Sequence, residues 1–296
     1  MRIARHLAAA FAVVTITGFA QTAQPKPELL LFHPSGPPLA YEVATIKPID
    51  PSTADRMVRL PPGASRSTSL SPFSIRRYIM DAYGAIYAAQ VVGGPDWLTK
   101  DAYNIKGKAP DDVEAAFQNM KFSDRNDQNH AMQQSLLADR FHLRAHFETR
   151  VLPAYELVPA KGGLKITAVP APPERKPGDS LPPPRPGGPL PPGSSMTMLN
   201  SNGLRVFNGN AIKMQALIRP IGPDAGDRPI VDHSGFTGFF DVKDLTWAPL
   251  DADAANIPDA PSLPLALEGK LGLKLVPAKA PIEVLVIDSI DRPTPN

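Results

Sequence analysis

One stretch decides the fold of this chain: Val91-Val92-Gly93-Gly94-Pro95-Asp96-Trp97-Leu98, which runs on to Tyr103-Asn104-Ile105. Two β-branched residues predict a strand, the Gly93-Gly94-Pro95 run predicts a corner that needs a positive φ, and the second segment predicts another strand. No Gly-Lys-Ser sequence follows the glycines and no helix is expected to begin there, so we favour a structural corner over a phosphate cradle. Trp97 follows the corner, where a ring more often plugs a core than stacks on a ligand.

A diverged version of this stretch recurs in the second half of the chain. Ile230-Val231 matches Val91-Val92 at a shift of 139 residues, and residues 270–274 match residues 140–144 at a shift of 130. The turn after this second strand holds Gly235, Phe236 and Gly238. The pattern predicts an internal duplication. We therefore predict an α+β fold of two similar units with mainly antiparallel sheets, each reading strand-helix-strand-strand and then helix-strand-strand.

Other elements follow from periodicity and alternation. A helix is predicted over residues 127–138. Residues 141–148 alternate strictly and predict a strand, with residues 151–159 returning as its hairpin partner. Residues 271–276 and 281–290 are predicted as two further strands.

The chain is predicted to divide into a first unit, residues 41–167, and a second unit, residues 196–292. Between them, residues 168–195 contain eleven prolines, from Pro170 to Pro192, mixed with Gly, Arg and Lys. Such a composition favours extended polyproline geometry and cannot pack a core. This segment is either a semi-rigid linker or a long loop.

Residues 1–20 predict a secretory signal peptide. Two arginines precede an apolar run, residues 7–19, and small residues stand before the expected cleavage point. Spanning a bilayer takes about 20 apolar residues, so the run is short for a permanent anchor. We expect cleavage after Ala20, with cleavage after Ala23 or retention as the alternatives, and then a flexible lead-in over residues 21–40. The mature chain is expected to be periplasmic or extracellular, without a stable membrane span.

Charge and cysteine usage exclude several classes of function. Of the 31 Lys and Arg residues two lie in the signal peptide, which leaves 29 basic against 29 acidic residues. A nucleic-acid interface needs clustered Lys and Arg, so we expect no nucleic-acid partner. The chain has no cysteine, which excludes disulfides, thiolate nucleophiles and Cys-ligated metals.

His142 and His146 invite a metal-site interpretation, because His-x-x-x-His on a helix presents both rings to one ion. The predicted strand separates these rings by roughly 13 Å, too far for one zinc, and favours a polar outer face. His146 and Glu148 can still form a local hydrogen-bonded pair. The nucleophile-elbow, Ser-x-x-Lys and His-Glu-x-x-His motifs are absent. We assign no catalytic residue, no metal and no cofactor, and we interpret three aspartates as turn formers or caps: Asp96, Asp232 and Asp241.

Several motifs, in order, resemble a family of exported bacterial proteins described as soil-associated and abundant in acidobacteria. In the first half the motifs are Tyr41–Pro48, Gln90–Leu98 and Leu136–Phe141. In the second half they are Val231-Asp232, Gly235–Gly238, Leu271–Leu275 and Ala280–Asp288. His233 stands where Lys or Arg is more usual in that family. The family is similar to domains attached to membrane-bound sensor peptidases of the antibiotic-response type, which implies a sensing or binding module without an agreed activity.

The sequence therefore predicts an exported, non-enzymatic module that binds an unknown exported protein, a peptide or a small molecule. We expect the ligand in the groove between the units, near the corners of Trp97 and Phe236, although an extended peptide can also pair with a sheet edge. The rival hypothesis is a periplasmic or secreted hydrolase acting on cell-wall or polymeric substrate with residues such as Asp96, His146 and Glu148. The candidate binding residues are Trp97, Asp96, Phe236, His146 and Glu148. The residues expected to build the turns are Gly93, Gly94, Pro95, Gly235 and Gly238.

Overall fold

The computed structural model describes residues 27–33, 39–50, 70–117, 119–174, 188–226, 228–250 and 260–293. The predicted signal peptide and residues 175–187 of the proline-rich segment lie outside this described part. Within it, no helix is long and apolar enough to cross a membrane.

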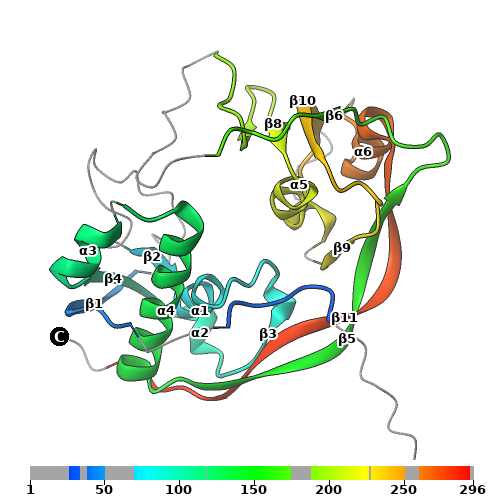
Figure 1. The fold of residues 1–296 in the computed structure, drawn as a ribbon. Coiled ribbons are helices and arrows are strands. Elements are labelled where there is room, and N and C mark those ends of the chain that lie inside the picture. Colours follow the sequence, from blue (N-terminus) through cyan, green and yellow to red (C-terminus); the bar gives the residue numbers. More distant parts are fainter. Residues whose placement is uncertain are drawn as a thin grey trace, which may run out of the picture.

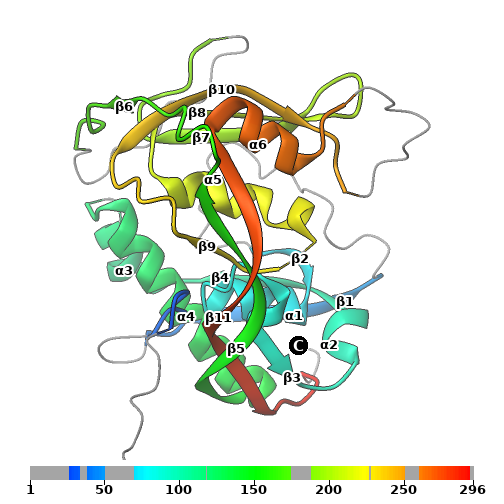
Figure 2. The same cartoon turned by 90° about the vertical axis from the view of Figure 1, so that its right-hand side faces the viewer.

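A twisted two-stranded ribbon joins the two lobes of the molecule (Figures 1 and 2). Its strands, β5 (Arg144–Pro159) and β11 (Leu273–Ser289), pair antiparallel along their whole length. At one end β3 (Val91–Gly93) adds parallel to β11, and at the other end β9 (Ile230–Asp232) adds parallel to β5. The ribbon thus becomes a four-stranded sheet in the order β3-β11-β5-β9.

The prediction of shorter strands in this region is wrong. Residues 144–159 form one strand whose partner is β11, not a hairpin, and residues 273–289 form one strand, not two. Strand β5 begins at Arg144 because Phe141 still belongs to the preceding helix and His142 turns the chain with a φ of 48°.

Three prolines inside the ribbon are tolerated because they lie on its outer edges. Tyr155 directs its N–H outward to the segment before β9 (2.8 Å), so Pro153, two residues earlier, also faces outward. Glu283 likewise directs its N–H outward, which places two more prolines on the outer edge of β11: Pro277 and Pro281. A proline at such a position removes no hydrogen bond between the two ribbon strands.

The first lobe is a three-stranded antiparallel sheet, in the order β1-β4-β2, packed with helices. Its elements are β1 (Val43–Ile49), β2 (Leu70–Ser74), α1 (Ile75–Ala82), the 3-10 turn η2 (Ala88–Gln90), α2 (Trp97–Lys100), β4 (Ala102–Lys108), α3 (Asp111–Phe117) and α4 (Phe122–Phe141). The predicted helix over residues 127–138 lies within α4. The hydrophobic core of this lobe, which we call the first-lobe core, combines Ile105 of the sheet, Ile79 of α1 and Leu137 of α4 with Ile287 from the end of β11.

The second lobe is a four-stranded antiparallel sheet in the order β6-β10-β8-β7. Its elements are β6 (Ala168–Val169), β7 (Ser194–Leu199), β8 (Arg205–Ile212), α5 (Met214–Ile221), the 3-10 turn η3 (Pro223–Ala225), β10 (Phe239–Trp247) and α6 (Leu263–Leu271). The hydrophobic core of this lobe, which we call the second-lobe core, combines Phe207 and Phe240 of the sheet with Leu217 of α5, Leu267 of α6 and Leu157 of β5.

The arrangement of elements recurs between the lobes. The order β6-β10-β8 in the second lobe repeats β1-β4-β2 in the first, and the helices before the ribbon strands both end at left-handed residues. These residues, His142 (φ 48°) and Gly272 (φ 64°), are separated by the shift of 130 found in the sequence. The α+β fold of mainly antiparallel sheets is confirmed, whereas an origin of the lobes by duplication stays a prediction.

Residues 27–33, part of the predicted lead-in, form a strap along the outer edge of β11. Backbone hydrogen bonds join the strap to Pro281 (2.8 Å) and Glu283 (3.3 Å). Leu29 enters the second-lobe core and Leu31 enters the first-lobe core. The strap therefore touches both cores, as the ribbon does.

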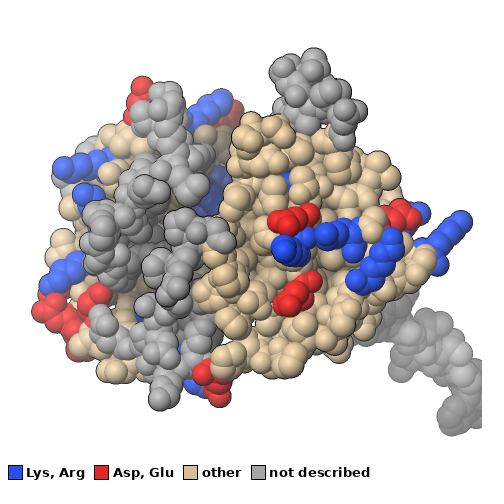
Figure 3. All heavy atoms as spheres, turned by 90° about the horizontal axis from the view of Figure 1, so that it is seen from above, with Lys and Arg blue, Asp and Glu red and all other residues tan. Residues whose placement is uncertain are grey.

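The surface of the second-lobe side is mixed in charge. Figure 3 shows the molecule from the top of the view in Figure 1. Acidic and basic side chains of the described residues lie next to one another there, and most of this face carries neither. No patch of a single sign of charge covers the described part of this face.

Candidate functional site

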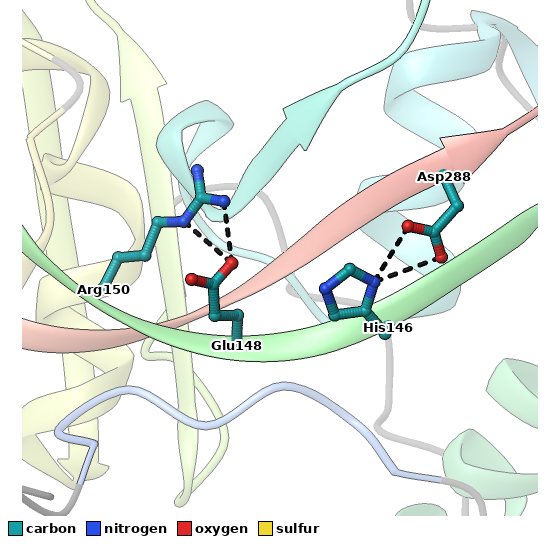
Figure 4. A network of polar contacts seen from close by, with 4 residues as sticks. All are labelled: His146, Glu148, Arg150 and Asp288. Carbon is teal, nitrogen blue, oxygen red and sulfur yellow. Dashed lines mark hydrogen bonds and ion pairs between the residues drawn. The ribbon is translucent and has the colours of Figure 1, made fainter.

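Two polar pairs stand side by side on the outer face of the ribbon (Figure 4). His146 Nδ1 lies 3.0 Å from an oxygen of Asp288, which links β5 to β11. Arg150 donates to Glu148 Oε2 from Nε (3.0 Å) and from Nη2 (2.7 Å). Phe147 points to the opposite face of the strand, where it packs against the first-lobe core. The expected polar outer face is therefore present on β5 at His146 and Glu148, whereas His142 precedes the strand and does not belong to this face.

These two pairs lie at the surface of the ribbon and contribute little stability. The four side chains are 38–55% exposed, and solvent screens ion pairs at such exposure. The hydrogen bond from Arg150 lowers the pKa of Glu148. Asp288 orients the ring of His146 as a carboxylate orients a base or a metal ligand. Even so, no group of three His, Cys, Asp or Glu residues in the described part of the chain could hold a metal ion.

The glycine corners are present, with one difference from the prediction. The φ angles of Gly93, Gly94 and Gly235 are 79°, 81° and 71°, as the predicted corners require. A helix does follow the first corner. The N–H of Leu98 donates to the carbonyl of Pro95 (3.1 Å), and the Leu98 side chain is buried. This helix, α2, begins at Trp97 and has a single turn.

The three residues named for the hydrolase hypothesis lie on two different elements and have three different partners. The Asp96 side chain is 87% exposed and pairs with Lys100 of α2 at 3.0 Å. His146 and Glu148 lie instead on the outer face of the ribbon. There His146 pairs with Asp288, and Glu148 pairs with Arg150. The structure thus places His146 and Glu148 on one face of β5, whereas Asp96 lies at the start of α2.

The two aromatic corners serve separate cores. Trp97 packs against the first-lobe core beneath Arg292, whose guanidinium carbon lies 5.2 Å from the ring centre. Phe236 packs against the second-lobe core, edge-on to Phe240 with ring centres 5.4 Å apart. A Cβ at Gly238 would lie 3.3 Å from the Phe236 ring, so this glycine leaves room for it. Neither Trp97 nor Phe236 lines either of the two cavities described below.

A cavity of about 740 Å³ opens between the ribbon, the end of β10 and the start of α6. We call it the α6 pocket. Most of its wall is apolar, with one tyrosine ring and two polar side chains. The lining residues are Tyr155, Asp224, Ala225, Gly226, Ala248, Pro249, Leu250, Ala260, Ser262, Leu263, Pro264, Leu275 and Pro277. This size and composition are typical of small-molecule sites.

Asp224 is a buried acid in the wall of this pocket. Trp247 Nε1 donates to its Oδ2 (2.8 Å), the Leu250 N–H donates to its Oδ1 (3.2 Å), and Arg205 Nε forms an ion pair with it at 2.6 Å. These three partners compensate the burial of the charge. Because the partners come from β8, β10 and the segment after β10, the acid fixes the wall of the pocket. No motif marked Asp224, since its partners lie elsewhere in the sequence.

A family model recognises most of the region just described. It carries the description "Protein of unknown function (DUF3738)" and matches residues 76–290, from α1 to the end of β11. The chain belongs to the DUF3738 family. Comparison with curated proteins and with solved structures finds no match. The ribbon and the α6 pocket lie inside the DUF3738 region, whereas β1 and the strap lie outside it.

A second buried acid of the DUF3738 region, Glu283, lies beneath the strap. Its Oε2 accepts a hydrogen bond from the Leu31 N–H (2.6 Å) and lies 3.0 Å from Nε2 of His33. The His33 ring stacks on Phe147 of β5, with ring centres 3.8 Å apart. The strap thus supplies the partners of this acid. Sequence reasoning missed Glu283 because no pattern in β11 reveals that another segment covers it.

Proposed function

We propose that this DUF3738 protein is an exported binding module that takes a compact, largely apolar ligand into the α6 pocket. The observation that carries this proposal is the cavity of about 740 Å³, walled by apolar side chains, the Tyr155 ring and one carboxylate. Pockets of this kind bind small molecules through apolar burial and a few placed polar groups. The expected signal peptide and the resemblance to sensor-attached domains support a role outside the cytoplasm.

The polar groups of the pocket narrow the class of ligand. Asp224 already accepts from Trp247 and Leu250 and pairs with Arg205, so its oxygens are engaged within the protein. Binding therefore depends on burial of apolar area and on contact with the Tyr155 ring. This favours an aromatic or branched apolar molecule over a sugar or a charged metabolite.

The rival function, hydrolysis of cell-wall or polymeric substrate, has less support. Asp96 is exposed on α2, and His146 and Glu148 are paired on the outer face of the ribbon. General acid–base chemistry needs its groups within hydrogen-bond reach of one substrate, and among the described residues no hydrogen bond or ion pair links Asp96 to His146 or Glu148.

Trp247 offers a direct test of the pocket, because its Nε1 bonds to Asp224 in the pocket wall. The chain has two tryptophans, so a Trp97→Phe variant leaves Trp247 as the single reporter. We expect the uncharged aromatic probe N-phenyl-1-naphthylamine to bind the folded mature chain saturably and to change the Trp247 emission. Members of a library of aromatic and branched apolar molecules should then displace the probe.

A matched pair of variants decides whether the pocket is the site. Ala248→Phe places a ring in the pocket wall and should abolish probe binding. Ala115→Phe makes the same change on the exposed side of α3 and should leave binding unchanged. Equal binding by both variants, each shown to be folded by circular dichroism, would refute the pocket.

Export is tested separately by expressing the full chain in a bacterial host and sequencing the N-terminus of the protein recovered outside the cytoplasm. The expected N-terminus is Gln21 or Gln24, directly after the two candidate cleavage points. Recovery of the unprocessed chain only in the cytoplasm would contradict export.

A further inference from the structure

β7 is an edge strand that lacks the usual protection. It reads Ser-Ser-Met-Thr-Met-Leu over residues 194–199, without a charge, a proline or a shift of register against β8. Soluble proteins normally blunt an edge with Lys, Pro or a bulge, because open N–H and C=O groups pair with other chains. Because β7 has none of these protections, it is a candidate docking strand.

The open backbone groups of β7 can be identified from its pairing. The N–H of Asn200 donates across the hairpin to Leu204 (2.9 Å), and hydrogen-bonded pairs alternate along antiparallel strands. Met196 and Met198 of β7 therefore bond to β8, whereas the N–H of Ser194 donates to Pro191 (3.2 Å). The residues that direct their N–H and C=O away from the sheet are Ser195, Thr197 and Leu199. In the part of the chain that the structure describes, no backbone hydrogen bond reaches these groups.

A groove of about 570 Å³ lies beside this edge, between β7, α5 and Ile86, which lies in the segment between α1 and η2. We call it the β7 groove. Ile86 and Pro220 give it an apolar part, whereas Gln215 and Arg219 of α5 give it a polar part. Arg219 is its only charged lining residue, and among the described residues this arginine forms no ion pair.

We propose that β7 binds an extended peptide segment of another exported protein by strand addition, with a carboxylate of that segment paired to Arg219. The backbone of the peptide would satisfy the open groups of β7, and alternate side chains would enter the β7 groove. A carboxylate suits Arg219 because a guanidinium binds it with two parallel hydrogen bonds. A second copy of β7 fits less well, because this strand carries no acidic side chain. This site is independent of the α6 pocket.

The test uses two synthetic, end-capped peptides: Thr-Val-Thr-Glu-Val-Thr-Val and the same peptide with Gln in place of Glu, each with a fluorescent label. Fluorescence anisotropy measures their binding to the mature chain. Thr197→Pro removes one outward N–H without removing a bond to β8, and Thr197→Val is its matched control. We expect Thr197→Pro to weaken the Glu peptide at least about tenfold and Thr197→Val to leave it unchanged.

The role of Arg219 is tested by Arg219→Gln. This variant should weaken the Glu peptide about fivefold and leave the Gln peptide unchanged. Amide exchange of the unaltered protein supplies a measurement that does not depend on variants, since the Glu peptide should slow exchange at Thr197 and Leu199. The proposal is overturned if neither peptide binds at millimolar concentration, or if binding occurs without slower exchange at these amides. Concentration-dependent self-association that Thr197→Pro abolishes, without peptide binding, would assign the edge to a second copy instead.

Discussion

At the scale of single residues, Gly94 is a tightly constrained position of the first corner. Its φ is 81°, and an added Cβ would meet Leu98 Cδ1 and lie 3.1 Å from Ile287 Cδ1. Leu98 is buried in the first-lobe core, so its side chain has little room to move. We expect Gly94→Ala to lower the free energy of unfolding by about 2–4 kcal/mol, from left-handed backbone strain and overpacking together.

Gly235→Ala separates these two causes. The φ of Gly235 is 71°, but nothing lies within 4 Å of an added Cβ. The free energy of unfolding should therefore fall only by the backbone strain of about 1–2 kcal/mol. Urea unfolding of both variants against the unaltered chain gives the comparison. Equal losses would mean that Leu98 moves aside freely, which is contrary to the packing described here.

The residues that sequence reasoning missed are buried acids. Of 29 acidic residues in the chain, the described part buries two, Asp224 and Glu283, and acids are rarely buried unless they are paired. The pairing partner is what a local pattern cannot show: Glu283 accepts from a backbone N–H 252 residues away. His146 and Glu148, by contrast, were predictable as neighbours, because strand alternation alone places them on one face.

At the scale of elements, the strap should behave as a structural part of the fold. Leu31 is 5% exposed and lies in the first-lobe core, whereas its neighbour Leu30 is 62% exposed. We expect Leu31→Ala to reduce the free energy of unfolding by about 2–4 kcal/mol and Leu30→Ala to change it by less than about 0.5 kcal/mol. Urea unfolding of the mature chain measures both. Identical curves for the two variants would show that the strap does not pack in solution.

Elements were predictable where the signal is local. The strand before the glycine corner, the strand after it and the inner part of α4 follow from alternation and periodicity. The continuity of β5 and β11 does not, because the tolerance of Pro153 and Pro281 depends on which edge each proline faces. That edge is set by β9 and the strap, which are distant in sequence. The one-turn helix at Trp97 was missed for a similar reason, since burial of Leu98 completes it.

At the scale of the whole molecule, the two halves exchange their short strands. β3 of the first half pairs with β11 of the second, and β9 of the second half pairs with β5 of the first. The cores are shared in the same way, because Leu285 and Ile287 enter the first-lobe core while Ala154 and Leu157 enter the second-lobe core. Neither half can complete its sheet or its core alone, and a lone ribbon strand would expose two unpaired edges.

We therefore expect the halves to fold only together. Residues 21–180 and 181–296, expressed as separate fragments divided within the proline-rich segment, should each lack cooperative urea unfolding by circular dichroism. An equimolar mixture should regain the spectrum and a single cooperative transition, because pairing restores the ribbon and both shared cores in one step. The control is the intact mature chain with a protease site placed in residues 175–187 and cut after folding, which should keep the same spectrum. Cooperative unfolding of either fragment alone would contradict the exchange, since that fragment would then possess a complete core of its own.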